Sequence, residues 1–254
     1  MKKNVVAGMG EIGLPIQKLL SRAIPVVGYD KKTELMNTKK FKKFENHETE
    51  ILHICIPFTK NFHRNVISLC DKFSPKCLVI HSTVQPHVTK KLQNKLTIPV
   101  IFSPIRGVHK RMLYDLKRYT KFFAIGSNAP KKTWAITTYS KLMKKCGVKT
   151  KKMSDPITLE LAKIICDTSY YGWLINYAPM SKTIATKNHT DYDEMWTFSD
   201  EIEKFLGNRP KMHPGYIGGH CVIPNLELIQ NETLNFIKKI NKTFYVQMNL
   251  KKHK

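Results

Sequence analysis

The chain has 254 residues, 42% of them hydrophobic and 10% aromatic, so it can bury a sizeable core and is not a disordered protein. Its formal net charge is +24, a value that often accompanies nucleic-acid or membrane-surface partners. Only six of the 43 basic residues are arginines, however, and the lysines are dispersed. The charge therefore indicates a solvated surface, and we do not expect nucleic acid as a partner.

The sequence contains no segment typical of a membrane anchor or a secretion signal. A transmembrane helix needs about 18 consecutive apolar residues, and the N-terminal apolar run is interrupted by glycines and Glu11. The six cysteines are irregularly spaced and form no CxxC pair. This pattern favours reduced thiols in a cytoplasmic protein over a disulfide framework or a metal site, and we expect no metal.

The first part of the chain alternates strand-like and helix-like segments. Runs of β-branched residues predict strands at 5–7, 25–29, 51–56, 77–80, 99–102 and 122–125. Longer stretches between them, such as 12–23 and 84–96, predict crossover helices. Because the runs lack period-two alternation, they are typical of parallel strands buried on both faces. Residues 1–153 are therefore predicted to form an α/β domain, a doubly wound parallel sheet with right-handed crossovers.

A glycine-rich turn follows the first predicted strand. Gly8 permits a tight turn, Gly10 lets a pyrophosphate approach the backbone, and Gly13 lets the next helix pack closely on the sheet. The N-terminus of that helix adds amide donors for the phosphates. Asp30, at the end of the next strand, can accept the ribose hydroxyls and repel a 2′-phosphate, which favours NAD over NADP. The motif predicts a Rossmann-type dinucleotide site; an ordinary glycine turn with a surface Asp is the alternative.

The second part, residues 154–254, is predicted to be a mainly helical domain. Pro156 suits the first turn of a helix, and the pattern continues as one long helix to about Lys187, with a kink expected at Pro179. A further helix is expected over residues 191–206. A glycine-rich loop then leads into a mostly helical tail.

That loop reads Gly215-Tyr216-Ile217-Gly218-Gly219-His220-Cys221. Its glycines allow backbone amides to close on a ligand, and Cys221 at a loop–helix junction has the setting of an activated nucleophilic thiol. Cysteine is also among the most buried residue types, so a packing role for Cys221 is the alternative.

Taken together, these motifs resemble the UDP-glucose/GDP-mannose dehydrogenase family, and the Gly-Gly-His-Cys sequence is most similar to its UDP-N-acetylhexosamine dehydrogenase branch. The resemblance covers nearly the whole chain and rests on motifs in the family's order: the glycine turn with Asp30, His81-Ser82-Thr83-Val84, Ser103-Pro104, Glu160-Leu161-Ala162-Lys163 and the loop ending at Cys221. It implies an NAD-dependent enzyme that oxidises the primary alcohol of a sugar nucleotide to a carboxylate through an enzyme thioester.

The resemblance also implies roles for single residues. Cys221 would capture the aldehyde, Lys163 would stabilise the oxyanion, and Thr83 would lie beside the nicotinamide and the reacting centre. The predicted cofactor-binding residues are Gly8, Gly10, Glu11, Ile12, Gly13, Asp30 and Thr83, and the predicted substrate-binding residues are Tyr216, Gly218 and Gly219. Without the resemblance, Lys163 reads equally well as a surface residue of an exposed helix.

The chain departs from the family at three places. Ile105 stands where the family has a glutamate that helps water hydrolyse the thioester; His109 is a candidate replacement base, or a surface residue. Asp167 and Asn225 stand where the family has Asn and Asp, an exchange that either compensates or is coincidental. The family also continues into a C-terminal nucleotide-binding domain. A separate chain or second subunit completing the site, a smaller acceptor and lost turnover are the open possibilities.

The long helix is the dimer element that the resemblance implies. Its aromatic residues would supply an interface or an intramolecular core, namely Tyr170, Tyr171, Trp173 and Tyr177. We therefore expect an NAD-dependent sugar-nucleotide 6-dehydrogenase, or a truncated relative, acting as a homodimer. A β-hydroxyacid dehydrogenase-like enzyme and a catalytically silent NAD-binding or regulatory protein are the alternatives.

Overall fold

The computed structural model describes residues 1–208, 210–219 and 222–252 and divides into two compact units, Met1–Leu161 and Ala162–Lys254. The division falls a few residues after the predicted boundary at 153/154. The reason is helix α7 (Pro156–Ala162), which packs with the first unit: Leu159 belongs to the core of that unit.

The first unit is built on one sheet. Among the described residues its strands are β1 (Lys2–Ala7), β2 (Val26–Tyr29), β3 (Glu48–Ile54), β4 (Cys77–Ile80), β5 (Val100–Phe102), β6 (Lys121–Ile125) and β7 (Thr150–Lys152). Their order is β2-β1-β3-β4-β5-β6-β7, and β1 to β5 are parallel. The predicted α/β fold is confirmed, and all six predicted strands are present.

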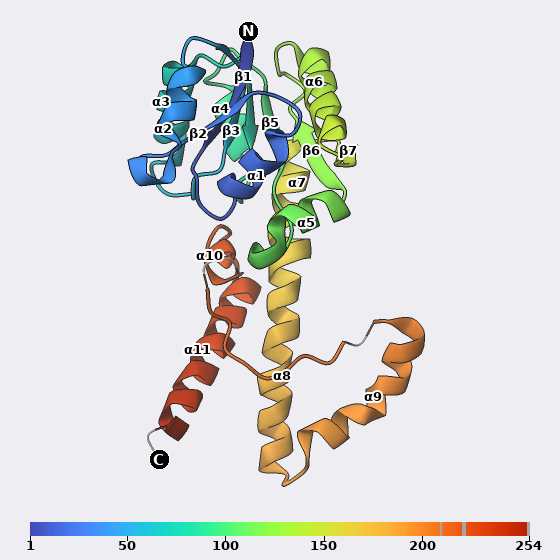
Figure 1. Ribbon diagram of the computed structural model, residues 1–254. Helices are drawn as coiled ribbons and strands as arrows, with labels where there is room; N and C mark the ends of the chain where they lie inside the picture. The colour runs from blue at the N-terminus through green and yellow to red at the C-terminus, as the bar shows by residue number, and fades with distance from the viewer. Residues whose placement is uncertain (209, 220–221, 253–254) are drawn as a thin grey trace. The chain divides into compact units, whose positions relative to one another are not determined.

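The far edge of the sheet differs from the prediction. Strand β6 is antiparallel to β5, and β7 pairs parallel with β6. Helix α5 (Met112–Arg118) explains the reversal, because it stays at the end of the sheet where β5 finishes, and β6 therefore runs back from that end (Figure 1). The sequence of β7, Thr-Lys-Lys, lacks the apolar run by which the other strands are predicted.

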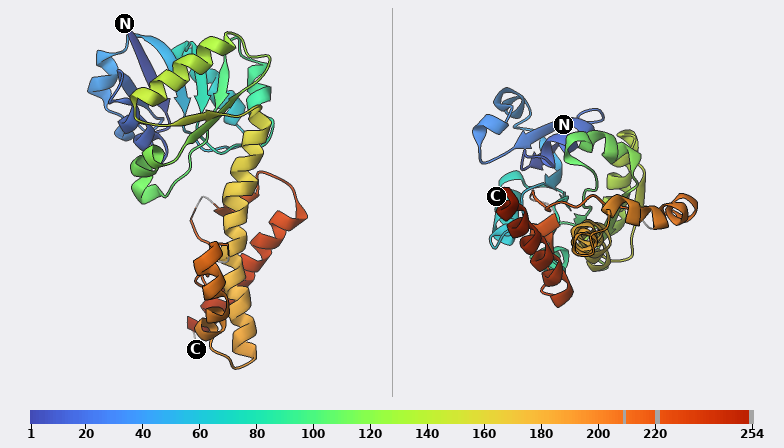
Figure 2. Two further views of the ribbon diagram at one scale, coloured as in Figure 1. Left: turned by 90° about the vertical axis from the view of Figure 1, so that its right-hand side faces the viewer. Right: turned by 90° about the horizontal axis from the view of Figure 1, so that it is seen from below.

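Helices cover both faces of the sheet. One face carries α1 (Gly13–Leu20), α5 and α6 (Lys132–Lys145); the other carries α2 (Thr38–Lys43), α3 (Phe62–Phe73), α4 (Val88–Gln93) and α7. Figure 2 shows α6 lying across its face of the sheet. Successive strand residues alternate between the two cores: Val6 and Val79 face the first, Val5 and Leu78 the second. Both faces are buried, which is why the strands show no polar face.

The predicted long helix is confirmed, with one feature that was not predicted. It begins at Pro156 as α7, continues through a π-helical segment (Lys163–Ser169) and ends as α8 (Tyr170–Lys187). Such wide turns are uncommon in helices and frequently occur at functional sites. Pro179 lies buried inside α8, and the kink expected there stays a prediction.

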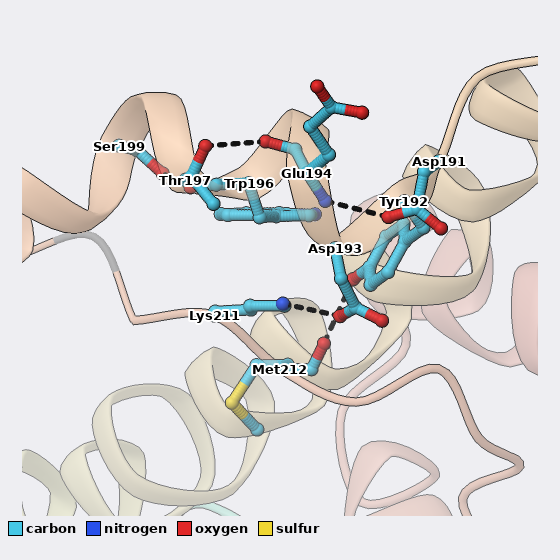
Figure 3. A network of polar contacts seen from close by, with 9 residues as sticks. All are labelled: Asp191, Tyr192, Asp193, Glu194, Trp196, Thr197, Ser199, Lys211 and Met212. Carbon is cyan, nitrogen blue, oxygen red and sulfur yellow. Dashed lines mark hydrogen bonds and ion pairs between the residues drawn. The ribbon is translucent and has the colours of Figure 1, made fainter.

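Helix α9 (Tyr192–Leu206) is also confirmed at both ends. Asp191 caps its N-terminus by accepting a hydrogen bond from the Glu194 amide at 2.8 Å, and Gly207 ends it in the left-handed conformation, with φ of +61°. Figure 3 shows that the first turn of α9 also holds the chain at residues 211 and 212.

The tail of the second unit packs on the long helix. It consists of α10 (Val222–Leu226) and α11 (Glu232–Lys252), which share a small core with the inward-facing Trp173. A Cβ added at Gly172 would lie 3.2 Å from Val222, so the glycine permits the close approach of α10.

Within the described residues, no helix is long and apolar enough to cross a membrane. The cysteines placed by the structure are all free: Cys55, Cys70, Cys77 and Cys146 are buried, and Cys166 is exposed.

Candidate cofactor and catalytic sites

The three glycines of the N-terminal turn have different surroundings. Gly8 has φ of +92°, and a Cβ there would lie 2.8 Å from the Cys55 carbonyl group. A Cβ on Gly13 would lie 1.7 Å from the Gly8 oxygen, so packing alone requires both glycines. Gly10 is exposed, and a Cβ there would meet no atom within 4 Å. The open space at Gly10 is where a phosphate can approach the backbone, so this turn fits a dinucleotide.

Asp30 lies beside this turn, as predicted from its place after β2. Its Oδ2 accepts a hydrogen bond from the Met9 amide at 2.7 Å, and its Oδ1 accepts one from the Lys32 amide at 3.0 Å. The two amides fix the carboxylate on the glycine turn. Each carboxylate oxygen can accept more than one hydrogen bond, so the half-buried group can still bind ribose hydroxyls.

Thr83 lies in the segment 81–87 that follows β4, and this segment is held at both ends. At its start, the Ser82 hydroxyl donates to the Ile56 carbonyl at 2.6 Å. At its end, the carboxylate of Glu160 accepts the His87 amide at 2.7 Å and the Thr89 amide at 2.9 Å. The Thr83 side chain is half-buried between these two anchors.

Glu160 is a positioning residue to which the sequence assigned no role, although it belongs to a motif that carries the resemblance. Its side chain is fully buried on α7 and caps the N-terminus of α4, where His87 has a left-handed φ of +71°. Burial raises the pKa of the carboxyl group, and the hydrogen bonds from Thr89 and His87 oppose that rise. Only the folded chain reveals the role, because about 70 residues separate the cap from its helix.

The predicted cofactor residue Glu11 and the candidate base His109 are paired. The His109 Nδ1 lies 2.6 Å from a carboxylate oxygen of Glu11, and both line a groove of about 800 Å³ between α1 and residues 109–117. Ile105, in contrast, is 6% exposed and belongs to the core, so it offers no group for acid–base chemistry. The structure therefore places His109 at the glycine turn.

In the second unit, the π-helical segment brings two predicted catalytic residues together. The Lys163 Nζ lies 2.5 Å from the Asp167 Oδ2; the lysine side chain is 12% exposed and the aspartate 40%. Helix α10, which carries Asn225, packs against this segment. Direct contact between Asn225 and Asp167 stays a prediction.

The loop before Cys221 is fixed by its flanking elements. On one side, the Tyr192 hydroxyl donates to the Met212 carbonyl at 2.9 Å, and Lys211 pairs with Asp193, both from the start of α9 (Figure 3). The substrate-binding candidates Gly218 and Gly219 lie beyond this anchor, exposed, and Gly219 has φ of +75°.

A second anchor comes from α11. The side chain of Asn241, 4% exposed, accepts the Ile217 amide at 2.8 Å and donates to the Ile217 carbonyl at 3.1 Å. The neighbouring Tyr216 ring packs on Tyr245, with centroids 4.7 Å apart. Asn241 was not predicted, because a single asparagine in a helical tail carries no sequence signal. Cys221, the predicted nucleophile, lies outside the described residues.

No group of three or more potential metal ligands occurs among the residues that the structure places. The first unit therefore holds a turn that fits a dinucleotide, and the second holds an ion-paired lysine and an anchored loop.

Comparisons with known proteins identify the fold. No family model and no curated protein matches the sequence. Among solved structures, the UDP-D-ManNAc dehydrogenase of Pyrococcus horikoshii has a TM-score of 0.77 at 18% identity, over 96% of this chain and 69% of that one. A UDP-glucose dehydrogenase of Pyrobaculum islandicum has a TM-score of 0.71 at 15% sequence identity, over 96% of this chain and 68% of that one. The 3-hydroxyisobutyrate dehydrogenase of Mycobacterium tuberculosis has a TM-score of 0.70 at 12% sequence identity, over 97% of this chain and 94% of that one. The chain has the fold of these dehydrogenases.

Proposed function

We propose that the protein is an NAD-dependent dehydrogenase of a UDP-sugar-type nucleotide, oxidising a primary alcohol to a carboxylate through a thioester on Cys221. The observation that carries the proposal is the fold shared over 96% of the chain with a UDP-D-ManNAc dehydrogenase, in a chain that also contains the Gly-Gly-His-Cys loop.

The cofactor would be held by the glycine turn, whose amides and open face at Gly10 receive the pyrophosphate, and by Asp30, which receives the adenosine ribose. Bound NAD would accept the hydride of each of the two oxidations. Asp30 selects against a 2′-phosphate by charge repulsion. Thr83, on the segment that Glu160 caps, borders the reacting end.

Covalent capture is the task of Cys221. Its sulfur adds to the aldehyde carbon, the aldehyde oxygen takes a proton, and the resulting thiohemiacetal is oxidised to a thioester. The ammonium group of Lys163 stabilises the negative charge that develops on that oxygen while the sulfur adds and before the proton arrives, and Asp167 holds the lysine in place. Asn225 on α10 supplies the amide group that the family is expected to have at the position of Asp167, one turn after the lysine.

Hydrolysis then releases the acid and regenerates the thiol. Water attacks the thioester carbon, the sulfur of Cys221 leaves, and a base takes the proton of water. With Ile105 buried in the core, the His109 imidazole is the proposed base, oriented through its pairing with Glu11. Because Ile105 removes the carboxylate that the resemblance implies at this position, we expect hydrolysis to be the slow step.

A second candidate is a β-hydroxyacid dehydrogenase. The Mycobacterium tuberculosis 3-hydroxyisobutyrate dehydrogenase is covered over 94% of its chain, more than the sugar-nucleotide enzymes are. In such an enzyme Lys163 would act without a cysteine nucleophile. A silent NAD-binding or regulatory protein is the remaining alternative, favoured by the buried Ile105.

We further propose that the enzyme is a cytoplasmic homodimer joined through the long helix. Tyr170, Tyr171 and Tyr177 expose half or more of their surface, whereas Trp173 packs inward on Phe236. A second apolar stripe follows one helix: Met195, Phe198, Ile202, Phe205 and Leu206 on α9. Such stripes are typical of interfaces, and a separate chain that completes the sugar-nucleotide site is the other proposed partner.

The test measures NADH formation with a panel of UDP- and GDP-sugars and short hydroxyacids, together with mass spectrometry of the quenched protein. The proposal expects turnover with a UDP-sugar and an acyl adduct on Cys221 that Cys221→Ser abolishes without changing NAD affinity. Cys166→Ser, at an exposed cysteine, is the matched control and should change neither. Turnover with hydroxyacids alone, unaffected by Cys221→Ser, would establish the second candidate instead.

A further inference from the structure

A row of buried polar side chains crosses four strands of the first unit. The amide of Asn4 on β1 lies 3.1 Å from the Nε2 of His53 on β3, and the Nδ1 of His53 lies 2.9 Å from the Nε2 of His81. The Nδ1 of His81 lies 2.9 Å from the Ser103 carbonyl oxygen, just beyond β5. All four residues are at most 1% exposed.

The chemistry of the two ends fixes the protons of the row. The Ser103 carbonyl can only accept, so His81 must donate from Nδ1, and its Nε2 must then accept. His53 therefore donates from Nδ1 and accepts at Nε2 from the amide group of Asn4. With both rings neutral, every group in the row has a partner, and the protons have a single consistent order.

Both rings are held neutral by their surroundings. Burial lowers the pKa of His53 to about 3, and burial lowers that of His81 well below its usual value; the positive charge of Lys121 acts in the same direction on both. The two rings lie within 8° of parallel, an arrangement that is compatible with the hydrogen bond between their edges.

The far end of the row is tied to the backbone after β5. The ammonium group of Lys121, on a residue 5% exposed, donates to the carbonyls of Ser103 at 2.9 Å and Pro104 at 3.2 Å. The Ser103 hydroxyl accepts from Tyr139 at 2.8 Å and donates to the Phe122 carbonyl at 2.8 Å. The row thus joins the segment after β4, which begins with His81, to the turn after β5.

The place of this row in the sheet relates it to the path of a bound dinucleotide. The glycine turn lies at β1 and Asp30 at β2, and the strand order is β2-β1-β3-β4-β5. A dinucleotide with its adenosine at β2 and its pyrophosphate at β1 must extend toward the ends of β4 and β5. Those are the two strand ends that His81 links.

We propose that the His53–His81 pair is a positioning device for the nicotinamide half of the cofactor site, rather than for the adenosine half. The ordered hydrogen bonds hold the segment with Thr83 and the turn at Ser103 at a fixed spacing. Buried polar side chains are costly unless fully paired, and apolar residues would fill the same space, so the row is explained by the geometry it imposes. The inference rests on the proposed NAD site.

The first test examines the row itself by ¹⁵N NMR of the histidine-labelled protein. We expect two histidines protonated at Nδ1, unchanged between pH 7 and pH 5, with a nitrogen–nitrogen coupling across the His53–His81 hydrogen bond. A histidine pair that titrates near pH 6.5, or that carries its protons on Nε2, would overturn the inference. This measurement needs neither a variant nor a bound ligand.

The second test separates the two halves of the cofactor. In His53→Phe we expect the Kd for NAD to rise about tenfold while the Kd for ADP, which lacks the nicotinamide half, changes less than twofold. The control is Gln93→Leu, which removes a buried side chain bonded to the amide of Val100 at the start of β5, the strand end opposite to Ser103. It should leave the ratio of the two Kd values unchanged.

The outcomes distinguish this inference from the proposed function. Equal weakening of NAD and ADP in His53→Phe, or no change in either, would reject the positioning role while leaving the NAD site intact. An unmodified protein that binds neither NAD nor ADP, with the NMR signature present, would reject the proposed function and the cofactor role together. If His53→Phe does not fold, the NMR measurement alone still decides whether the proton order exists.

Discussion

Asp30 is the single residue on which cofactor choice depends. Its carboxylate is fixed on the glycine turn by the Met9 and Lys32 amides, so it meets the adenosine ribose without reorganising. Asp30→Ala should weaken NAD binding about tenfold, the loss of about 1.4 kcal/mol, and narrow the preference over NADP. Fluorescence titrations with both cofactors measure this.

Glu34→Ala is the control for the loss of one negative charge, because it removes an exposed carboxylate four residues after Asp30. It should leave the preference unchanged. Equal affinity of the unmodified protein for NAD and NADP would show that Asp30 does not select the cofactor.

A second residue-scale prediction concerns the exchanged pair Asp167 and Asn225. If the carboxylate and the amide serve one centre around Lys163, Asp167→Asn should reduce turnover more than the double change Asp167→Asn with Asn225→Asp. The measurement is kcat for the two single variants and the double variant. Effects on log kcat that simply add would mean that the two positions act independently.

At the scale of elements, Asn241 links the catalytic loop to α11. Both of its hydrogen bonds go to the backbone of Ile217, and both backbone groups would lose their partner in Asn241→Ala. The change should cost about 1–3 kcal/mol of unfolding free energy and lower kcat, with NAD affinity unchanged. Urea unfolding and steady-state kinetics measure these effects.

The matched control is Asn235→Ala, which changes an exposed asparagine on the same helix. It should alter neither stability nor kcat by a measurable amount. A kcat for Asn241→Ala equal to that of the parent would mean that the loop does not need this anchor.

Some elements could be predicted from the sequence and others could not, for physical reasons. The strands through β6 were predictable because burial on both faces leaves continuous apolar runs such as Cys77–Ile80. The ends of α9 were predictable because Asp191 and Gly207 act locally. The π-helical segment was not, since its Lys163 and Asp167 also suit an ordinary helical turn. Trp173, which packs inward, could not be told from its exposed tyrosine neighbours.

The residues of the candidate site also divide into predictable and unpredictable ones. The glycine turn and Asp30 were predictable because neighbouring segments form the turn, and their hydrogen bond spans adjacent strands. Glu160, Asn241 and His53 were not predicted, because no sequence motif points to the hydrogen-bond partner of any of them. Long-range hydrogen bonds of this kind leave no local pattern.

For the whole molecule, the two neutral histidines predict how stability depends on pH. Below pH 6.5 the unfolded chain binds a proton on each ring, while folded His53 stays neutral until about pH 3 and His81 is likewise protected. Unfolding therefore takes up protons, and stability falls as the pH falls, by up to about 1.4 kcal/mol per pH unit for each histidine.

Urea unfolding between pH 7 and pH 5 tests this prediction. The window lies above the range where Asp115 titrates, because the Val108 amide lowers the pKa of that carboxyl group further. The double variant His53→Phe with His81→Phe should show a shallower dependence than the parent. The same slope in both proteins would mean that the pair does not take up protons on unfolding.

The most direct test of the central claim is the stoichiometry of NADH in the first turnover, followed by stopped-flow absorbance. With a UDP-sugar substrate, fast oxidation and slow hydrolysis predict a burst of up to about two NADH per active site, followed by a slower steady rate. His109→Ala should slow the steady rate and leave the burst intact. Linear NADH production from the first turnover, with no adduct on Cys221, would contradict a rate-limiting thioester, and no NADH with any sugar nucleotide despite NAD binding would contradict the proposed enzyme.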